Sequence, residues 1–447
     1  MKNFIETLKN IWKIEELRNR ILITLGFILI YRIGSFVVLP GVDLDALEAG
    51  NSSGSGDGLI GLLALFTGGA FSRASIFALG IMPYISASII MQLMGIAVPS
   101  IQKMQREGES GQKRLNQITR FLTVAITSLQ APGYLAATVT TVPGAVPMET
   151  TGWWISSIII LSAGTLFVMW MGERITDRGI GNGISLLIMI GIIASLPGAF
   201  IQEVISQTGL GGGGLVMLLV EIVFLLLVIA ATIALVQATR RVPVQFAKRV
   251  VGNKQYGGVR QYIPLKVNAA GVMPIIFAQA IMFVPLYIAQ ALNAEPGAFL
   301  QSMVNINGFW YNFIFFLMVV IFTYFYTAIT VNPNQMADDL KRNGGFIPGV
   351  KPGKKTSEFL DNLLSRITLP GAVFLGLVAI LPSFAVMFGV KQGFALFFGG
   401  TSLLIMVGVV LDTLQQIESH LLSRHYDGLM KSGKIKGRGS SAFGMAG

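Results

Sequence analysis

The segment Phe77–Ile85 reads FALGIMPYI, and 191 positions further along the chain the segment Asn268–Ile276 reads NAAGVMPII. When aligned, the two segments share the frame A-x-G-x-M-P-x-I. A second matching pair, in which both copies read SLLIM, begins at Ser185 and at Ser402, and each copy follows a glycine-rich lead. Because the two pairs occur in the same order, we infer that the chain contains one structural unit twice.

The composition of the chain is typical of a membrane protein. Of its 447 residues, 53% are hydrophobic and only 12% are charged, whereas a soluble domain is about a quarter charged. So few charges cannot cover a water-facing surface, and we expect most of the chain to face lipid. The chain has no cysteine, which excludes a disulfide framework and a thiolate metal site. No small-residue cleavage site follows the N-terminus, so we expect no cleavable signal peptide.

Ten apolar stretches are long enough to cross a bilayer, which takes about 20 residues per helix. The first repeated motif lies on the second and seventh of these spans, and the other lies on the fifth and tenth. The repeated unit therefore has five spans, and because five is odd the second copy enters from the opposite side. The sequence predicts an all-α integral membrane protein with ten transmembrane helices in two inverted five-helix halves. The spans are 21–40, 75–98, 118–139, 153–171, 183–201, 215–236, 267–290, 310–331, 367–390 and 397–418.

Basic residues alternate between the two sides of the predicted bundle. Every second connection, together with both termini, holds 30 of the 33 Lys and Arg residues. The other side carries only Arg73 and Lys391, and Arg32 lies inside the first span. Such an imbalance predicts that both termini are cytoplasmic. The predicted parts are a cytoplasmic N-terminus (1–20), an N-terminal half (21–201), an external hinge (202–214), a C-terminal half (215–420) and a cytoplasmic tail (421–447).

Equivalent isoleucines of the repeats fall at one depth. Ile276 follows Lys266 by ten residues, and Ile188 follows Arg178 by ten, which at 1.5 Å per residue places both about 15 Å deep, near the midplane. One interpretation is ordinary core packing. The alternative is a hydrophobic constriction that closes to ions by dewetting. The equivalent isoleucines are Ile85, Ile276, Ile188 and Ile405, and Ile81 and Ile184 lie one turn from two of them on the same helix face.

A short apolar segment lies between the first two spans. The flexible stretch NSSGSGDG (51–58) precedes it, and the apolar part, 59–66, is too short to cross before Gly68 and Gly69 interrupt it. We consider two possibilities: a re-entrant element buried in protein, and an external loop that packs on the surface.

The sequence offers no catalytic or metal-binding constellation at depth. Ionisable residues within the spans, which are Arg32, Glu221, Asp412 and Glu418, are isolated or near span ends. A coupled transporter usually carries acidic or histidine groups at depth. The loop RGIGNG (178–183) lacks the Lys-Ser/Thr ending of a phosphate loop and is interpreted as a tight turn. Two long basic loops, 237–266 and 332–366, could set topology at the lipid surface or dock an acidic partner or ribosomal RNA.

Several long motifs resemble those of the SecY family, the channel subunits of the bacterial Sec protein-conducting translocon. The similarity extends from the first span to beyond the tenth. It is carried by SRASIFALGIMPYISASII (72–90), QREGESGQKR (105–114), GERITDRGIGNGIS (172–185), PLKVNAAGVMP (264–274) and FGGTSLLI (398–405).

The resemblance implies roles for individual residues. The six isoleucines named above match the family's pore ring, the apolar gasket around a translocating chain. The segment 59–73 matches the family's plug, with Leu59, Leu62, Leu63, Leu65, Phe66, Gly68 and Gly69 as its residues. Spans two and seven match the lateral gate, with spans three and eight beside them. The polar residues on or near these spans are Ser86, Gln92, Gln130 and Gln279.

The resemblance also implies partners. These are the small membrane subunits SecE and SecG, the SecA ATPase, the ribosome, signal-sequence-bearing polypeptides and the lipid bilayer, with SecDF and YidC as further candidates. The long loops match the docking sites for motor and ribosome, through Arg240, Arg241, Lys248, Arg249 and Lys351. The family commonly has arginine at the position of Lys351 and two basic residues where this chain has Asn253 and Lys254, so the family's detailed contacts do not carry over at these positions.

The expected function is a passive channel in the bacterial cell (inner) membrane. It would secrete unfolded proteins and release membrane segments sideways into lipid. No enzymatic activity and no cofactor are expected, because no energy-coupling site is evident and the driving force must come from a partner. The alternative is an inverted-repeat secondary transporter of a small solute. An intramembrane enzyme lacks candidate residues.

Overall fold

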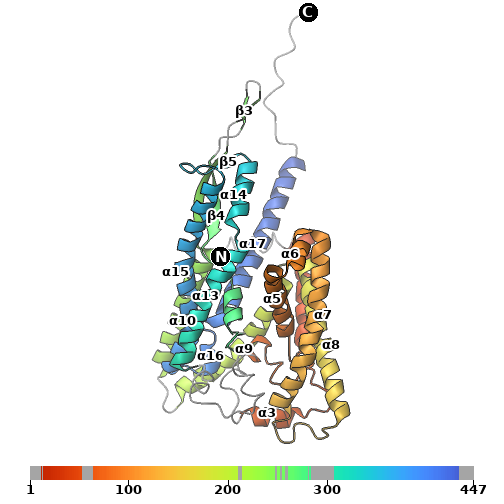
Figure 1. Ribbon diagram of the computed structural model, residues 1–447. Coiled ribbons are helices and arrows are strands. Elements are labelled where there is room, and N and C mark those ends of the chain that lie inside the picture. The colour runs from red at the N-terminus through yellow and green to blue at the C-terminus, as the bar shows by residue number, and fades with distance from the viewer. Residues whose placement is uncertain are drawn as a thin grey trace, which may run out of the picture.

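The computed structural model is a bundle of long helices with an extension at one end (Figure 1). The C-terminal end of α17 (Gly400–Lys431) and the strands lie toward that end, and the short helices α3 (Leu44–Ser52) and α16 (Gln392–Ala395) lie toward the other. The structure describes residues 12, 14–52, 64–209, 214–246, 249–251, 254–256, 260–279, 281–282 and 307–431.

The first half of the chain forms one side of the bundle. Helix α5 packs on α7, α7 on α8, and α8 on α9, while α2 lies against α8 and α9. The helices are α2 (Glu15–Gly34), α5 (Met82–Ala97), α6 (Pro99–Arg106), α7 (Glu109–Tyr134) with the π-helical turn η1 (Leu135–Val139), α8 (Thr151–Arg178) and α9 (Gly183–Thr208).

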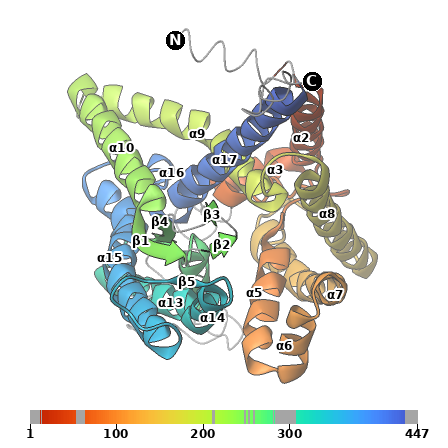
Figure 2. The ribbon, with the colours of Figure 1, turned by 90° about the horizontal axis from the view of Figure 1, so that it is seen from above.

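The second half of the chain forms the other side, as the view from above shows (Figure 2). Helix α13 packs along α15, and α17 lies against α10 and α15. Contacts between the halves run mainly through α9, which packs against α10, α16 and α17. The helices are α10 (Gly214–Gln237), α13 (Phe309–Thr330), α14 (Pro333–Arg342), α15 (Lys354–Met387) and α17 (Gly400–Lys431).

Most of the long helices can cross a membrane. Among the described residues, seven are long and apolar enough, and the bent pair α5 and α6 makes an eighth if it counts as one span. Their outer faces are apolar: Leu215 and Val216 of α10 are 71% and 76% exposed, as expected for side chains that meet lipid. Only part of the predicted seventh span is described, and residues 273–279 of it are helical.

Several helices run past the predicted span ends, as α15 and α17 do, and two predicted spans include residues that are not helical. The first was expected at 21–40, but α2 runs from Glu15 to Gly34 and the chain then turns. The second was expected from residue 75, but helix α5 begins at Met82. The preceding residues form turns: Gly80 has a positive φ of 53°, and Pro83 then stands in the first turn of α5, where proline needs no N–H donor. Hydropathy cannot detect these breaks, since the residues remain apolar.

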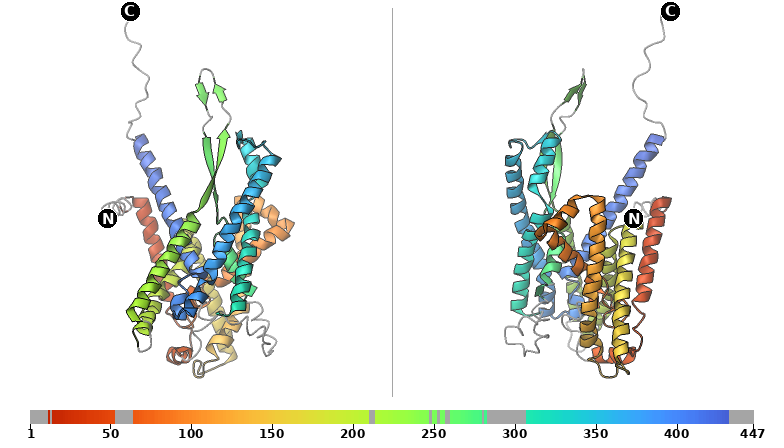
Figure 3. Two further views of the ribbon diagram at one scale, coloured as in Figure 1. Left: turned by 90° about the vertical axis from the view of Figure 1, so that its left-hand side faces the viewer. Right: turned by 45° about the vertical axis from the view of Figure 1, so that its right-hand side comes forward.

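The two long basic loops meet in a small sheet at one end of the bundle, beside the helices (Figure 3). Strand β1 (Thr239–Phe246) pairs antiparallel with β4 (Arg260–Lys266) and, at its far end, with β5 (Gly345–Phe346). A further hairpin, β2 (Arg249–Val251) with β3 (Lys254–Tyr256), extends from it. Val242 and Val244 of β1 pack with the residues of α14 and α15 in a separate apolar core. The sequence did not predict this sheet.

Candidate functional site: a constriction between the halves

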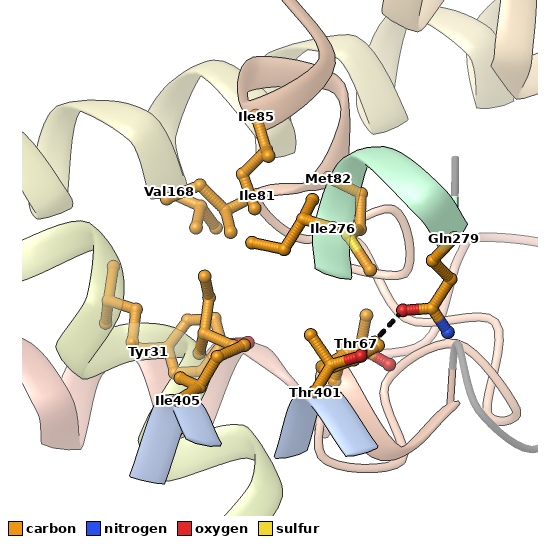
Figure 4. Close-up of a pocket in the computed structure, with 13 residues that line it drawn as sticks. Tyr31, Thr67, Ile81, Met82, Ile85, Val168, Ile276, Gln279, Thr401 and Ile405 are labelled. Carbon is orange, nitrogen blue, oxygen red and sulfur yellow. Dashed lines mark hydrogen bonds between the residues drawn. The ribbon is translucent and has the colours of Figure 1, made fainter. Parts of the chain in front are cut away.

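A narrow apolar cavity lies where the two halves meet (Figure 4). Ile81 and Ile85 reach it from the start of α5, Ile188 from α9, Ile276 from the helical turn at 273–279, and Ile405 from α17. The cavity has a volume of about 40 Å³, which is room for one or two water molecules. Five isoleucines from four separate segments therefore surround a space that is nearly closed.

The sixth predicted isoleucine lies beside this cavity. Ile184 is one turn from Ile188 on α9, is partly buried, and packs against the same core, but it does not line the space. Phe66, predicted as a plug residue, and Gln279, predicted at the gate, also line the cavity. Met82 and Leu187 lie within the repeated motifs but were not predicted to line it. The remaining lining residues, which the sequence analysis did not identify, are Tyr31, Thr67, Val168 and Thr401.

Local turns aim these side chains inward. The side chain of Asn182 accepts hydrogen bonds from the backbone of Ile184 and Ser185 and so starts α9. Gly400, with φ of 66°, starts α17 in the same region. The glycine-rich segments that precede Ile188 and Ile405 are therefore the turns at which α9 and α17 begin.

The lining carries no charged side chain. Its polar groups are hydroxyls and one amide, and the Thr401 hydroxyl donates to the side-chain oxygen of Gln279 at 2.8 Å. An ion in this space would lose most of its water and meet no charged ligand, and an apolar constriction of this size dewets. Among the described residues, no group of three or more His, Asp or Glu side chains could hold a metal ion.

The segment matched to the plug packs into the base of the cavity. Leu65 and Phe66 are 6% and 7% exposed, and Phe66 and Thr67 line the cavity beside the isoleucines. Gly68 and Gly69, with φ of 64° and 85°, turn the chain back. Leu59, Leu62 and Leu63 lie outside the described residues.

The residues matched to the lateral gate fall in different places. Gln92 of α5 lies 3.5 Å from the Tyr326 hydroxyl of α13, and both line a second cavity of about 170 Å³ between the halves. The Ser86 hydroxyl donates to Met82 within α5. Gln279 pairs with Thr401, as described above. Gln130 is exposed near the end of α7 and lines neither cavity.

The basic residues matched to docking lie on the extramembrane sheet and its surroundings. Arg240 and Arg241 are exposed on β1, and Lys351 is exposed just before α15. Arg249 begins strand β2. Lys248 lies outside the described residues.

Comparisons with known proteins agree with this arrangement. The family model described as SecY matches residues 75–414. The protein translocase subunit SecY of Streptomyces galbus is 43% identical over 430 residues, covering 93% of this chain and 97% of that protein. The protein translocase subunit SecY of Thermus thermophilus is 42% identical over 449 residues, covering 96% and 99%.

Solved structures are similar in fold. A structure of a protein conducting channel has a TM-score of 0.60 at 18% identity, covering 93% of this chain and 95% of that chain. A Sec61 structure from the canine ribosome-channel complex of the endoplasmic reticulum has a TM-score of 0.57 at 17% identity, with the same coverage. These similarities confirm the predicted fold of ten helices in two halves.

Proposed function

The chain belongs to the SecY family, and from this we propose that its isoleucine constriction is where the channel is kept closed to ions. The protein is the pore-forming subunit of a protein translocase: it conducts unfolded polypeptides across a membrane and admits apolar segments into it. The observation that carries the proposal is the convergence of Ile81, Ile85, Ile188, Ile276 and Ile405 on one nearly closed cavity. Isoleucine side chains adapt to varied side chains in transit and offer them no hydrogen bond.

We assign the plug to residues 59–73. The burial of Leu65 and Phe66 at the base of the constriction supports this assignment. It is also supported by a solved relative in fold, described as showing that the plug domain of SecY stabilises the closed state and maintains a membrane seal. An emerging polypeptide would displace this segment from the cavity.

We assign the hinge to the region around 202–214 and the lateral gate to the opposite side of the bundle. Helix α9 packs against three elements of the second half, whereas α5 and α13 face each other across the cavity lined by Gln92 and Tyr326. Opening on that side would expose a translocating segment to lipid. A segment then partitions by its composition, each Leu or Ile favouring insertion by about 0.3–0.6 kcal/mol.

Two observations support a proposal about partners: the family of the chain, and the basic extension formed by strands β1 to β4. A relative in fold was solved in a ribosome-channel complex, and the exposed Arg240 and Arg241 suit a phosphate-rich surface. We propose the ribosome and the SecA ATPase as alternative partners of this extension, and SecE and SecG as partners within the membrane. The channel itself is passive, and the partner supplies the driving force.

We place the protein in the bacterial inner membrane with both termini in the cytoplasm. The distribution of Lys and Arg supports this orientation. In the structure, the basic strands and the C-terminal end of α17 lie toward the same end of the bundle.

A reconstituted translocation assay tests the proposal. The complex is placed in liposomes with a secretory precursor and SecA, and the protease-protected precursor is measured with and without ATP. We expect protection that requires ATP, together with a low potassium leak from resting vesicles. A resting leak as high as that of a translocating channel would contradict the closed constriction. ATP-independent uptake of a small solute without precursor protection would favour a transporter instead.

A further inference from the structure

An arginine near the end of the first helix reaches into the plug. Arg32 lies in the last turn of α2, and its Nη1 donates a hydrogen bond of 3.2 Å to the carbonyl oxygen of Gly68. Neither the repeat nor the pore ring accounts for a cation inside an apolar span. Near a helix end, water or lipid headgroups could accept all the N–H donors of an arginine. Arg32 instead donates to a backbone carbonyl oxygen of the protein.

The carbonyl that Arg32 binds belongs to a tightly enclosed turn. A Cβ atom on Gly68 would lie 2.8 Å from Arg32 Nη1 and 3.0 Å from the Cα of Gly191 on α9. A Cβ atom on Gly191 would overlap the carbonyl oxygen of Phe66. The plug backbone is thus seated directly on α9, with the Arg32 guanidinium against its other side. Thr67, between these residues, faces the constriction (Figure 4).

Neighbouring side chains hold the guanidinium in this position. The Arg32 Cζ atom lies 5.2 Å from the ring centroid of Phe36, and the Arg73 Cζ atom lies 4.6 Å from the same centroid. Arg73 in turn lies 3.9 Å from Glu48 of α3. Cation–π contacts of this kind limit the rotamers of an arginine without using its N–H donors. The Arg32 donors therefore remain available for Gly68.

The far end of the plug is fixed by different means. Residues 37–39 exchange backbone hydrogen bonds with residues 74–76, from Leu39 to Ala74 and from Ile76 to Val37, each at 2.9 Å. These bonds lie beyond the turn at Gly68 and do not restrain it. The turn at Gly68 is therefore held by the Arg32 bond and the fit against Gly191, beside the buried side chains of Leu65 and Phe66.

We propose that Arg32 is a positioning residue that holds the plug in its closed place through the carbonyl of Gly68. This inference rests on the plug assignment made above. A hydrogen bond from a charged donor is roughly twice as strong as a neutral one, and a polypeptide that pushes the plug aside must break it. Arg32 thereby sets the balance between a sealed and an open resting channel.

Potassium conductance of the resting channel tests the proposal, measured in planar bilayers with the complete purified complex in symmetric KCl. Four forms are compared: wild type, Arg32→Met, a deletion of residues 59–67, and the two changes combined. We expect Arg32→Met to raise the resting conductance about tenfold, the factor that losing one charge-assisted hydrogen bond gives. We expect Arg32→Met to cause no further increase in the channel that lacks residues 59–67, because the Arg32 bond then has no plug to hold in place.

Three controls keep the outcomes separate. Arg18→Met makes the same substitution at the other end of α2 and should leave the conductance unchanged. Arg32→Lys keeps the charge but loses the planar fork, so its conductance should lie between those of wild type and Arg32→Met. Gly191→Ala displaces the same turn from α9 with Arg32 intact, and should also raise the conductance.

Two results would overturn the inference while leaving the plug in place. One is a raised resting conductance in the deletion variant together with a wild-type conductance in Arg32→Met. The other is an Arg32→Met effect of equal size with and without the deletion, which would place its action elsewhere. A deletion that does not leak would instead reject the plug assignment itself.

Discussion

The backbone N–H of Lys391 donates a hydrogen bond of 2.8 Å to a carboxylate oxygen of Glu203, and this bond joins the two halves at one end of α9. The other oxygen of Glu203 accepts from the Gln207 amide, which also donates to Glu221 of α10. At the other end of α9, the backbone N–H of Gly181 donates to the side chain of Gln416 of α17 at 2.8 Å. Helix α9 is therefore bonded to the second half at both ends, which supports placing the hinge beside it.

Removing the Glu203 carboxylate should destabilise this junction. Glu203 is fully buried, so Glu203→Ala leaves the Lys391 N–H and one Gln207 N–H without their acceptor, at a cost of about 2 kcal/mol or more. We expect a lower thermal unfolding midpoint of the detergent-solubilised complex. Gln202→Ala is the matched control, since that neighbouring side chain is exposed. Equal midpoints for the two variants would show that the network does not stabilise the junction.

A polar residue in the constriction should open it to ions. Two isoleucines on the same helix allow this effect to be separated from a general disturbance of core packing. Ile188 lines the cavity and Ile184 does not. Ile188→Asn places an amide that binds water in the narrowest space, so we expect resting potassium conductance to rise about tenfold. Ile184→Asn should change it much less, and Ile188→Leu should leave it near the wild-type value.

The contrast between these variants decides the assignment of the pore ring. Equal leaks from Ile184→Asn and Ile188→Asn would mean that any polar substitution in this core disturbs the channel. An unchanged conductance in Ile188→Asn would return these isoleucines to ordinary core packing.

That Ile188 and Ile276 meet was accessible from the sequence, but the full lining of the constriction was not. Repeated motifs and a rise of 1.5 Å per residue placed Ile188 and Ile276 at one level, and the structure brings them together. The rotation of each helix about its axis is set by packing against neighbours far along the chain. For that reason Ile184 falls outside the lining, while Val168 of α8 is part of it.

The sequence also did not predict the hydrogen bonds between polar side chains of different helices. Glu221 was interpreted as isolated, but the structure gives it the amide of Gln207, a partner fourteen positions away on another helix. The sheet of β1 and β4 escaped because its strands lie in basic loops whose composition indicates topology rather than strand structure. The helix ends were missed where glycine and proline break an apolar run, as they do before Met82.

Making the gate cavity apolar should raise the threshold for membrane insertion. Gln92 lines the cavity with Phe277, Phe325 and Tyr326, so Gln92→Leu adds apolar contact that stabilises the closed gate by about 1 kcal/mol. Each leucine of a test segment contributes about 0.3–0.6 kcal/mol. We therefore expect half-maximal insertion to require about two additional leucines, measured by glycosylation or protease mapping of a graded series of segments.

Gln130→Leu serves as the control for the gate. It makes the same change of side chain at an exposed position that lines neither cavity, and it should leave the insertion threshold where it was. Two results would contradict a gate at this cavity. One is a lower insertion threshold in Gln92→Leu, and the other is an equal shift of the threshold in both variants.

The two arginines of β1 should contribute unequally to ribosome binding. Side chains alternate across a strand, so Arg240 shares a face with the buried Val242, whereas Arg241 lies on the face turned away from that core. A phosphate-rich partner approaching the free face would meet Arg241. We expect Arg241→Ala to weaken binding and to reduce the slope of log K against log salt by about 0.7–0.9, the value for one lost phosphate contact.

Arg240→Ala is the matched control on the adjacent residue and should change the salt slope much less. Binding is measured by titrating ribosomes against the reconstituted complex at several KCl concentrations, because a single affinity cannot separate a lost phosphate contact from a disturbed strand. A disturbed strand would weaken binding at every salt concentration and leave the slope unchanged. Equal loss of slope in both variants would mean that the partner surrounds the end of the strand, and the assignment to one face of β1 would be wrong.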